Sequence, residues 1–156
     1  MEEKIDIKAK TIKVDTGKGN TIKATMSYGE QSTLEELLIA YLEQIAIYLR
    51  LSKEDEFVKD ESNSITNQRA FIRGFINKNK ELRKVSVIEF VDDGYSGKNM
   101  DRPDMQRMLE MVKRKQISCV IVKDFSRFSR DHIEQGKYIE QIFPFMGVRF
   151  IAINDN

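Results

Sequence analysis

Hydrophobic residues beyond residue 45 recur with two different periods, and the two periods alternate along the chain. Continuous or alternating apolar runs are typical of strands and occupy residues 45–52, 84–91, 117–123 and 148–154. Apolar residues at helical spacing predict helices over residues 64–79, 103–115 and 131–146. Strands that are separated by helices favour an α/β fold with a mostly parallel sheet of about four strands, flanked by helices.

Two of these elements predict where the core lies. In the helix over 64–79, we expect the inward residues to be Ile65, Phe71, Ile72 and Phe75. The strand over 117–123 is nearly all apolar, which is typical of a strand that is buried on both faces.

Residues 1–44 follow a different pattern and predict a small ββα appendage. Apolar residues alternate with polar ones over 12–14 and 22–26, and the turn between them contains two glycines. Ser32 and Glu35 form a capping box that predicts a helix start. The glycines lack the Walker spacing, so a hairpin turn is favoured over a phosphate-binding loop. We therefore expect two domains, 1–44 and 45–156, and assign no function to the first.

Composition excludes several classes of protein. One Cys and one His exclude a disulfide framework and leave little material for a metal site. No apolar run approaches the roughly 20 residues of a membrane span, and no secretory signal is present, so we expect a cytoplasmic protein without a membrane partner. The net charge is +1, with a net −2 over 1–45 and +3 over the rest. This excludes DNA binding through bulk positive charge but not through a local patch.

Polar side chains gather where the predicted strands end. Three strand ends carry arginines, serines and carboxylates, which are Arg50, Ser52, Asp93, Ser96, Arg102, Asp124, Arg127 and Arg130. In open parallel sheets, ligands bind beyond the carboxyl ends of the strands. The arginine fork holds phosphate oxygens two at a time, and a nearby serine can act as a nucleophile. The pattern therefore predicts phosphoryl chemistry at this edge of the sheet.

Four motifs in order carry a family resemblance. They are Tyr-x-Arg-x-Ser at 48–52, Ser-x-x-x-Gln at 64–68, an acidic, Ser-Gly and Asp-Arg-Pro segment at 92–109, and an Arg-x-x-Arg segment at 126–131. Together they resemble the catalytic domain of the serine recombinases, the resolvase/invertase and large serine integrase/transposase family. The resemblance covers residues 45–156 and is greatest to the large members from mobile elements.

The resemblance implies a mechanism and a set of roles. Ser52 would attack a DNA phosphodiester and form a 5′-phosphoseryl bond, so that strands are cut and rejoined for integration or excision of a mobile element. The scissile phosphate would be bound by Arg50, Arg102, Arg127 and Arg130. Gln68, Asp93 and Ser96 match supporting positions. The family uses no metal or cofactor, acts on double-stranded DNA, self-associates into dimers or tetramers, and would work at the bacterial nucleoid.

One position departs from the family pattern. Small resolvases have Asp directly before the first arginine of the last motif, and this chain has Ser126 there. Asp124 lies two residues earlier and is our candidate for the same role.

Two alternatives remain open. Asp92, Asp93 and Asp124 imitate the acidic residues of a response-regulator receiver, although the Ser/Thr and Lys expected on later strands are missing. The chain also ends just after a strand, so we expect a catalytic domain that is cut short at its carboxyl end. Such a remnant would be catalytically silent or weak, would act at most as an interaction module, and would bind DNA weakly.

Overall fold

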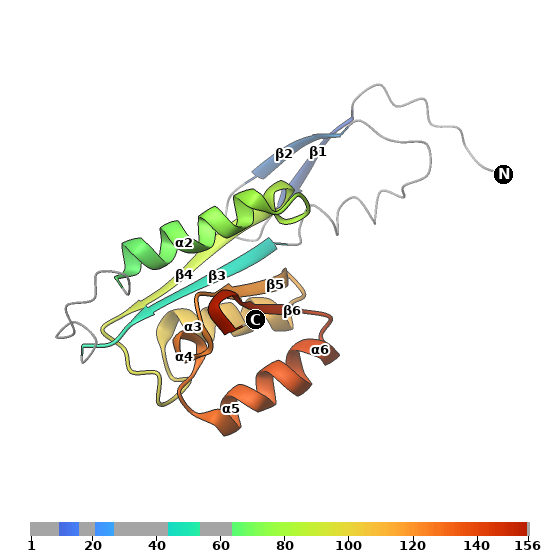
Figure 1. Cartoon of the computed structure of the whole chain (residues 1–156). Helices are drawn as coiled ribbons and strands as arrows, with labels where there is room; N and C mark the ends of the chain where they lie inside the picture. Colours follow the sequence, from blue (N-terminus) through green and yellow to red (C-terminus); the bar gives the residue numbers. More distant parts are fainter. Residues whose placement is uncertain (1–9, 16–20, 27–43, 54–63, 156) are drawn as a thin grey trace. The chain divides into compact units, whose positions relative to one another are not determined.

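The computed structural model describes residues 10–15, 21–26, 44–53 and 64–155 (Figure 1). The chain divides into two compact units, Met1–Ala40 and Tyr41–Asn156, and each is described by itself. In the first unit, strands β1 (Lys10–Asp15) and β2 (Thr21–Met26) pair antiparallel, as the alternating pattern predicted. The predicted helix that begins at Ser32 lies outside the described residues, and the domain boundary stays a prediction.

The second unit is built on a parallel sheet of four strands. They are β3 (Gln44–Leu51), β4 (Ser86–Asp93), β5 (Ile117–Val122) and β6 (Arg149–Ala152). Their order in the sheet is β4-β3-β5-β6, and each neighbouring pair is parallel. The predicted α/β fold is therefore confirmed, with β3 and β5 in the centre and β4 and β6 at the edges.

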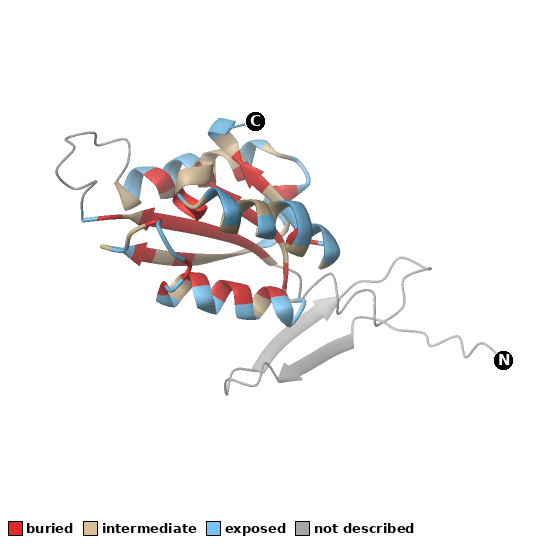
Figure 2. Ribbon diagram, turned by 90° about the horizontal axis from the view of Figure 1, so that it is seen from below, coloured by how far each residue is buried: buried red, intermediate tan, exposed pale blue. Residues whose placement is uncertain are grey.

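Helix α2 (Ile65–Lys78) covers one face of this sheet. Ser64 begins the helix by accepting a hydrogen bond from the N–H of Asn67. Ile72 and Ile76 pack against the odd-numbered apolar residues of β3. Strand β3 is buried over nearly its whole length (Figure 2). The expectation that Phe71 points inward is wrong, since it is 41 % exposed. The buried face follows steps of four residues and includes Gln68, which leaves Phe71 on the flank of the helix.

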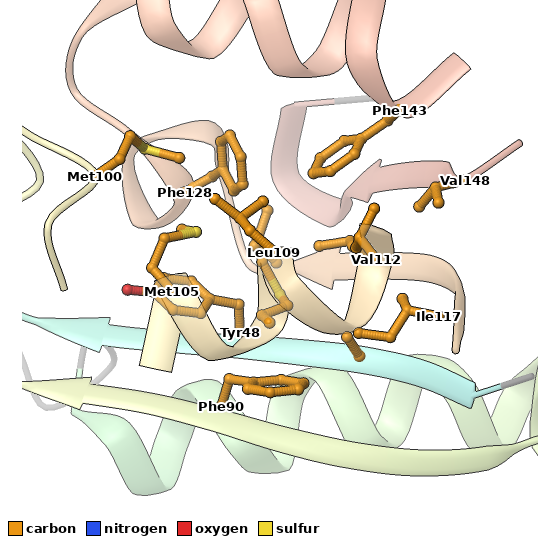
Figure 3. Close-up of a cluster of buried hydrophobic side chains, with 14 of the residues drawn as sticks. Tyr48, Phe90, Met100, Met105, Leu109, Val112, Ile117, Phe128, Phe143 and Val148 are labelled. Carbon is orange, nitrogen blue, oxygen red and sulfur yellow. The ribbon is translucent and has the colours of Figure 1, made fainter. Parts of the chain in front are cut away.

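Helix α3 (Pro103–Lys113) covers the opposite face with the segments that follow β5. Pro103 occupies the first turn of α3, as predicted, where its missing N–H leaves no gap in the helix. The core of this face joins Met105 and Leu109 of α3 to Tyr48 of β3, Phe90 of β4 and Phe128 (Figure 3). Alternate residues of β3 thus serve opposite faces of the sheet.

Strand β5 is buried on both faces, as its apolar sequence predicted. Cys119 lies within it, and burial raises the pKa of this thiol to about 11. A thiol that holds its proton so firmly is a poor nucleophile, so Cys119 serves as a packing residue.

The helix predicted over 131–146 is continuous but does not keep α-helical geometry throughout. It consists of α5 (His132–Gly136), a π-helical stretch (Lys137–Ile142) and α6 (Phe143–Phe145). The wider stretch ends two residues before Pro144, which has no N–H to continue an α-helical hydrogen-bond ladder. Within the described residues, the other helical segments are α4 (Phe125–Phe128) and the 3₁₀ turns Leu82–Lys84 and Ile153–Asp155.

The outer edge of β4 is covered by side chains from α3. Asp104 accepts a hydrogen bond from the Val91 N–H at 2.7 Å, and Arg107 donates to the Glu89 carbonyl at 3.2 Å. Two main-chain groups of an edge strand therefore have partners within their own unit.

Candidate active site

Ser52 directly follows β3 at the carboxyl edge of the sheet and is buried. The segment after β4 returns to it, because the N–H of Gly94 donates to the Leu51 carbonyl at 2.6 Å. The segment after β5 turns at once into α4, because the Asp124 side chain accepts the Arg127 N–H and caps this short helix. The predicted convergence of strand ends is therefore present around β3.

Arg50 joins these three strand ends. Its side chain is fully buried, and its guanidinium donates to three main-chain carbonyls. The acceptors are the oxygens of Tyr95 at 3.1 Å, Ser126 at 2.7 Å and Arg127 at 3.2 Å. Arg50 thus fixes the loops after β4 and β5 relative to the strand that leads to Ser52.

Gln68 reaches across from α2 and holds the main chain of Arg50. Its amide donates to the Arg50 carbonyl at 2.9 Å and accepts from the Arg50 N–H at 3.3 Å. Arg127 donates to the same carbonyl at 3.1 Å. Both side chains are buried, so the backbone two residues before Ser52 is held from both faces of the sheet.

Arg102 is the second fully buried arginine. It is the residue before Pro103 at the start of α3 and donates to the carbonyls of Asn99 at 3.0 Å and Phe128. It also donates to the Tyr48 hydroxyl at 2.8 Å. Arg102 therefore links the loop after β4 to α4.

Arg130 is exposed, unlike the other three arginines. Its N–H donates to the Gly97 carbonyl at 2.8 Å. A Cβ atom on Gly97 would lie 2.9 Å from the Arg130 side chain and 2.9 Å from Arg50 Nη2. The close approach of Arg50 and Arg130 therefore requires glycine between them.

The predicted carboxylates and Ser96 occupy different environments. Asp93 is exposed at the end of β4, and Ser96 is half-buried and accepts the Lys98 N–H at 3.2 Å. Asp124 accepts the Ser126 hydroxyl, and its other oxygen lies 3.9 Å from Arg127 Nε. Asp124 therefore lies beside Arg127, the first arginine of the last motif, and its role as the family's acid stays a prediction.

Sequence reasoning missed two buried residues of the site. Tyr48 donates to Asp92 at 2.6 Å, and both are almost completely buried. The sequence pattern singled out Asp93, and not its neighbour Asp92, as a site residue. One available signal was the strand alternation, since Tyr48 and Arg50 are two residues apart on β3 and share a face.

The arginine cluster carries strong positive charge in a buried setting. Burial, followed by the charges of Arg102, Arg130 and Arg127, lowers the pKa of Arg50 to about 10. Arg50 still keeps its proton at neutral pH. A bound anion would relieve the mutual repulsion of these groups, and the guanidinium fork suits phosphate oxygens.

The surface beside the cluster is hollowed. Arg130 and Ser126 line this hollow together with Asp124, His132 and Asp155. Among the described residues, no group of three or more His, Cys, Asp or Glu is arranged to hold a metal ion. In the same part of the chain, no helix is long and apolar enough to cross a membrane.

Comparisons with known proteins identify the family of the second unit. The family model described as "Resolvase, N terminal domain" matches residues 45–156. A "Putative DNA recombinase" of Bacillus subtilis (strain 168) is 35% identical over 91 residues, which are 58% of this chain and 17% of that protein. This chain therefore spans about a sixth of the curated relative's length.

Two solved structures resemble the second unit. The N-terminal catalytic domain of TP901-1 integrase matches with a TM-score of 0.60 and 25% identity, over 72% of this chain and 78% of that one. A resolvase family site-specific recombinase from Streptococcus pneumoniae matches with a TM-score of 0.55 and 25% identity, over 72% and 73%. The resemblance to serine recombinases is thus confirmed, and the chain belongs to the family of the resolvase N-terminal domain.

Proposed function

We propose that this chain carries the catalytic domain of a site-specific serine recombinase that cuts and rejoins double-stranded DNA. The observation that carries the proposal is the interlocked set of Arg50, Arg102 and Arg127 around the strand that leads to Ser52. Integration or excision of a mobile element, and self-association of the whole protein, belong to the same proposal. They rest on the family resemblance.

In the proposed step, Ser52 Oγ attacks the phosphorus of a DNA phosphodiester. A bond forms between Oγ and phosphorus while the bond from phosphorus to the 3′-oxygen breaks. The serine gives up its proton, and the 3′-oxygen gains one and leaves as a hydroxyl. One phosphoester bond replaces another, so the reverse attack by a 3′-hydroxyl rejoins the strand without ATP.

We assign different roles to the four arginines. Arg130 is exposed, so it is the first of the four to contact a DNA phosphate that enters the site. Arg50, Arg102 and Arg127 are buried, stabilise the negative charge of the transition state and hold the loops in place. They supply the charge that a metal ion provides in other phosphoryl transfer enzymes. Gln68, Asp93, Ser96 and Asp124 support this arrangement.

The receiver alternative receives no support from the geometry. Asp92 caps α3 and Asp124 caps α4, while Asp93 is exposed. These carboxylates therefore do not form one acidic pocket among the described residues.

The proposal is tested by searching for the covalent intermediate. The protein is incubated with a supercoiled plasmid library of the DNA that flanks its own coding sequence, and the reaction is stopped with denaturant. Trypsin and nuclease digestion followed by mass spectrometry should find a nucleotide 5′-phosphate attached to the peptide that contains Ser52. The catalytically silent alternative predicts no such peptide at any protein concentration.

DNA affinity should be low and only moderately dependent on salt. The four arginines share one scissile phosphate, and neutralising one phosphate gives a slope of log K against log salt of about −1. Arg130→Ala should make this slope shallower. The control is Arg114→Ala, because Arg114 is exposed and pairs with Glu110. A slope that Arg130→Ala leaves unchanged would contradict the phosphate contact.

Gly97→Ala should lower the cleavage rate while the protein stays folded. The added methyl group must displace the guanidinium of Arg50 or the stem of Arg130. A displacement of this size typically reduces a rate on the order of 100-fold. The measurement is the single-turnover rate of covalent complex formation. Gly74→Ala is the control, because a Cβ at Gly74 meets nothing within 4 Å, and it should leave the rate unchanged.

A further inference from the structure

We infer that Asp92 is a positioning residue that orients the Arg102 guanidinium through the hydroxyl of Tyr48. This inference rests on the proposed function, because Arg102 acts there on the scissile phosphate. It assigns a role to a carboxylate that lies one residue before the exposed Asp93.

The three groups form a continuous chain of hydrogen bonds inside the core. The Tyr48 hydroxyl donates to Asp92 Oδ2 at 2.6 Å and accepts from Arg102 Nη1 at 2.8 Å. Relative exposures are 0% for Tyr48, 1% for Asp92 and 1% for Arg102. Water therefore does not compete for these bonds, and the low local dielectric strengthens them.

The direction of each bond follows from the carboxylate. A tyrosine hydroxyl has one proton, and burial raises the pKa of Tyr48, so the proton stays in place. Asp92 accepts a hydrogen bond from the Tyr48 hydroxyl. The proton of the hydroxyl therefore points to Asp92, and its lone pairs face Arg102. Without the carboxylate, the hydroxyl proton is free to point elsewhere, including toward Arg102 Nη1, which has only protons to offer.

Asp92 is itself fixed by the main chain of α3. Its Oδ1 accepts the Asp104 N–H at 3.0 Å, and its Oδ2 accepts the Met105 N–H at 3.0 Å. Because Arg102 immediately precedes this helix, Asp92 is anchored to the same element that carries the arginine. Asp92 therefore fixes both the Tyr48 hydroxyl that binds the guanidinium and the start of the helix that carries Arg102.

A displacement of the Arg102 guanidinium would also change its contacts with α4. The same guanidinium donates to the carbonyl of Phe128 and, at 3.4 Å, to that of Arg127. Arg127 in turn holds the Arg50 carbonyl at 3.1 Å. Loss of the Asp92 carboxylate should therefore disturb phosphate chemistry without removing any group that touches the phosphate.

The test compares Asp92→Asn, Tyr48→Phe and the double variant in the covalent-complex assay with the flanking-DNA plasmid library. Each single variant should slow cleavage about 10- to 100-fold, the usual range for a misplaced catalytic group, with the DNA dissociation constant unchanged. If Asp92 acts through Tyr48, the double variant is no slower than the slower single variant. Asp104→Asn is the control, because the Asp104 carboxylate also joins the start of α3 to β4, through the Val91 N–H, without touching Tyr48.

A second measurement does not depend on cleavage. In ¹⁵N-labelled protein, the hydrogen-bonded Arg102 guanidinium should give separate, slowly exchanging Nη signals, which the Arg102→Lys spectrum assigns. Tyr48→Phe and Asp92→Asn should merge them, and Asp104→Asn should not.

The outcomes separate the two proposals. Independent, multiplying effects of the two substitutions, an equal loss in Asp104→Asn, or unchanged Arg102 signals would overturn the role of Asp92. A wild-type protein that forms no covalent complex would instead refute the proposed function, and the Arg102 signals would then decide the positioning role. If Asp92→Asn does not fold, Tyr48→Phe decides it, since this variant keeps the aromatic ring in the core.

Discussion

Ser52→Ala should abolish the covalent protein–DNA complex, with a loss of at least about 10⁴-fold, as is typical when an enzyme loses its nucleophile. DNA binding should persist, because the arginines remain. The fold should also persist, since removing one buried hydroxyl changes the free energy of unfolding by about 1 kcal/mol. The measurement is the yield of denaturant-resistant complex at equal DNA occupancy, together with a urea unfolding curve.

Ser86→Ala provides the matched control for this result. Ser86 is an exposed serine at the opposite end of the parallel sheet, at the start of β4. Its replacement should leave both the complex and the unfolding curve unchanged. A covalent link that survives in Ser52→Ala and maps to Ser96 or Ser126 would show that the nucleophile has been assigned to the wrong serine.

Arg50→Met should reduce both stability and cleavage. Methionine fills much of the same volume but leaves the carbonyls of Tyr95 and Ser126 without the Arg50 donor, while the Arg127 carbonyl keeps only the 3.4 Å contact from Arg102. A buried carbonyl without a partner costs about 1–3 kcal/mol, and relief of the repulsion from Arg102, Arg130 and Arg127 offsets part of this. We expect a net loss of about 2–4 kcal/mol in the free energy of unfolding and a fall in cleavage on the order of 100- to 1,000-fold.

A further variant separates charge from geometry at this position, and a second variant provides the matched control. Arg50→Lys keeps the charge but cannot reach three carbonyls at once, so it should lose almost as much activity as Arg50→Met. Arg69→Met removes a half-exposed arginine that pairs with Glu89, and it should change stability by no more than about 1 kcal/mol. An Arg50→Met protein that unfolds at the wild-type urea midpoint would disprove the stabilising role of the three carbonyl contacts.

The sequence pattern correctly predicted the features that depend on a single helix or strand. Arg50 and Ser52 stand at the end of the strand predicted over 45–52, which put them at the sheet edge where the neighbouring strands also end. The apolar run of β5 indicated burial on both faces. Pro103 marked the start of α3 for a local reason that tertiary contacts do not override.

Long-range contacts decided the features that sequence could not show. Asp92 and Asp93 are the last two residues of β4 and point to opposite faces, but which of them faces Tyr48 depends on the register between β3 and β4. The carbonyl partners of Arg50 come from loops about 45 and 76 residues away. Phe71 was misplaced because an apolar side chain on the flank of a helix fits the periodicity nearly as well as one that faces the core.

The covered edge of β4 affects how this protein behaves in concentrated solution. An edge strand with open main-chain groups is a template on which the strand of another molecule can dock, and aggregation often begins there. Asp104 and Arg107 occupy the Val91 N–H and the Glu89 carbonyl, so an incoming strand would have to displace a charged pair before gaining its own hydrogen bonds. The first two turns of α3 therefore help to keep separate molecules from joining their sheets.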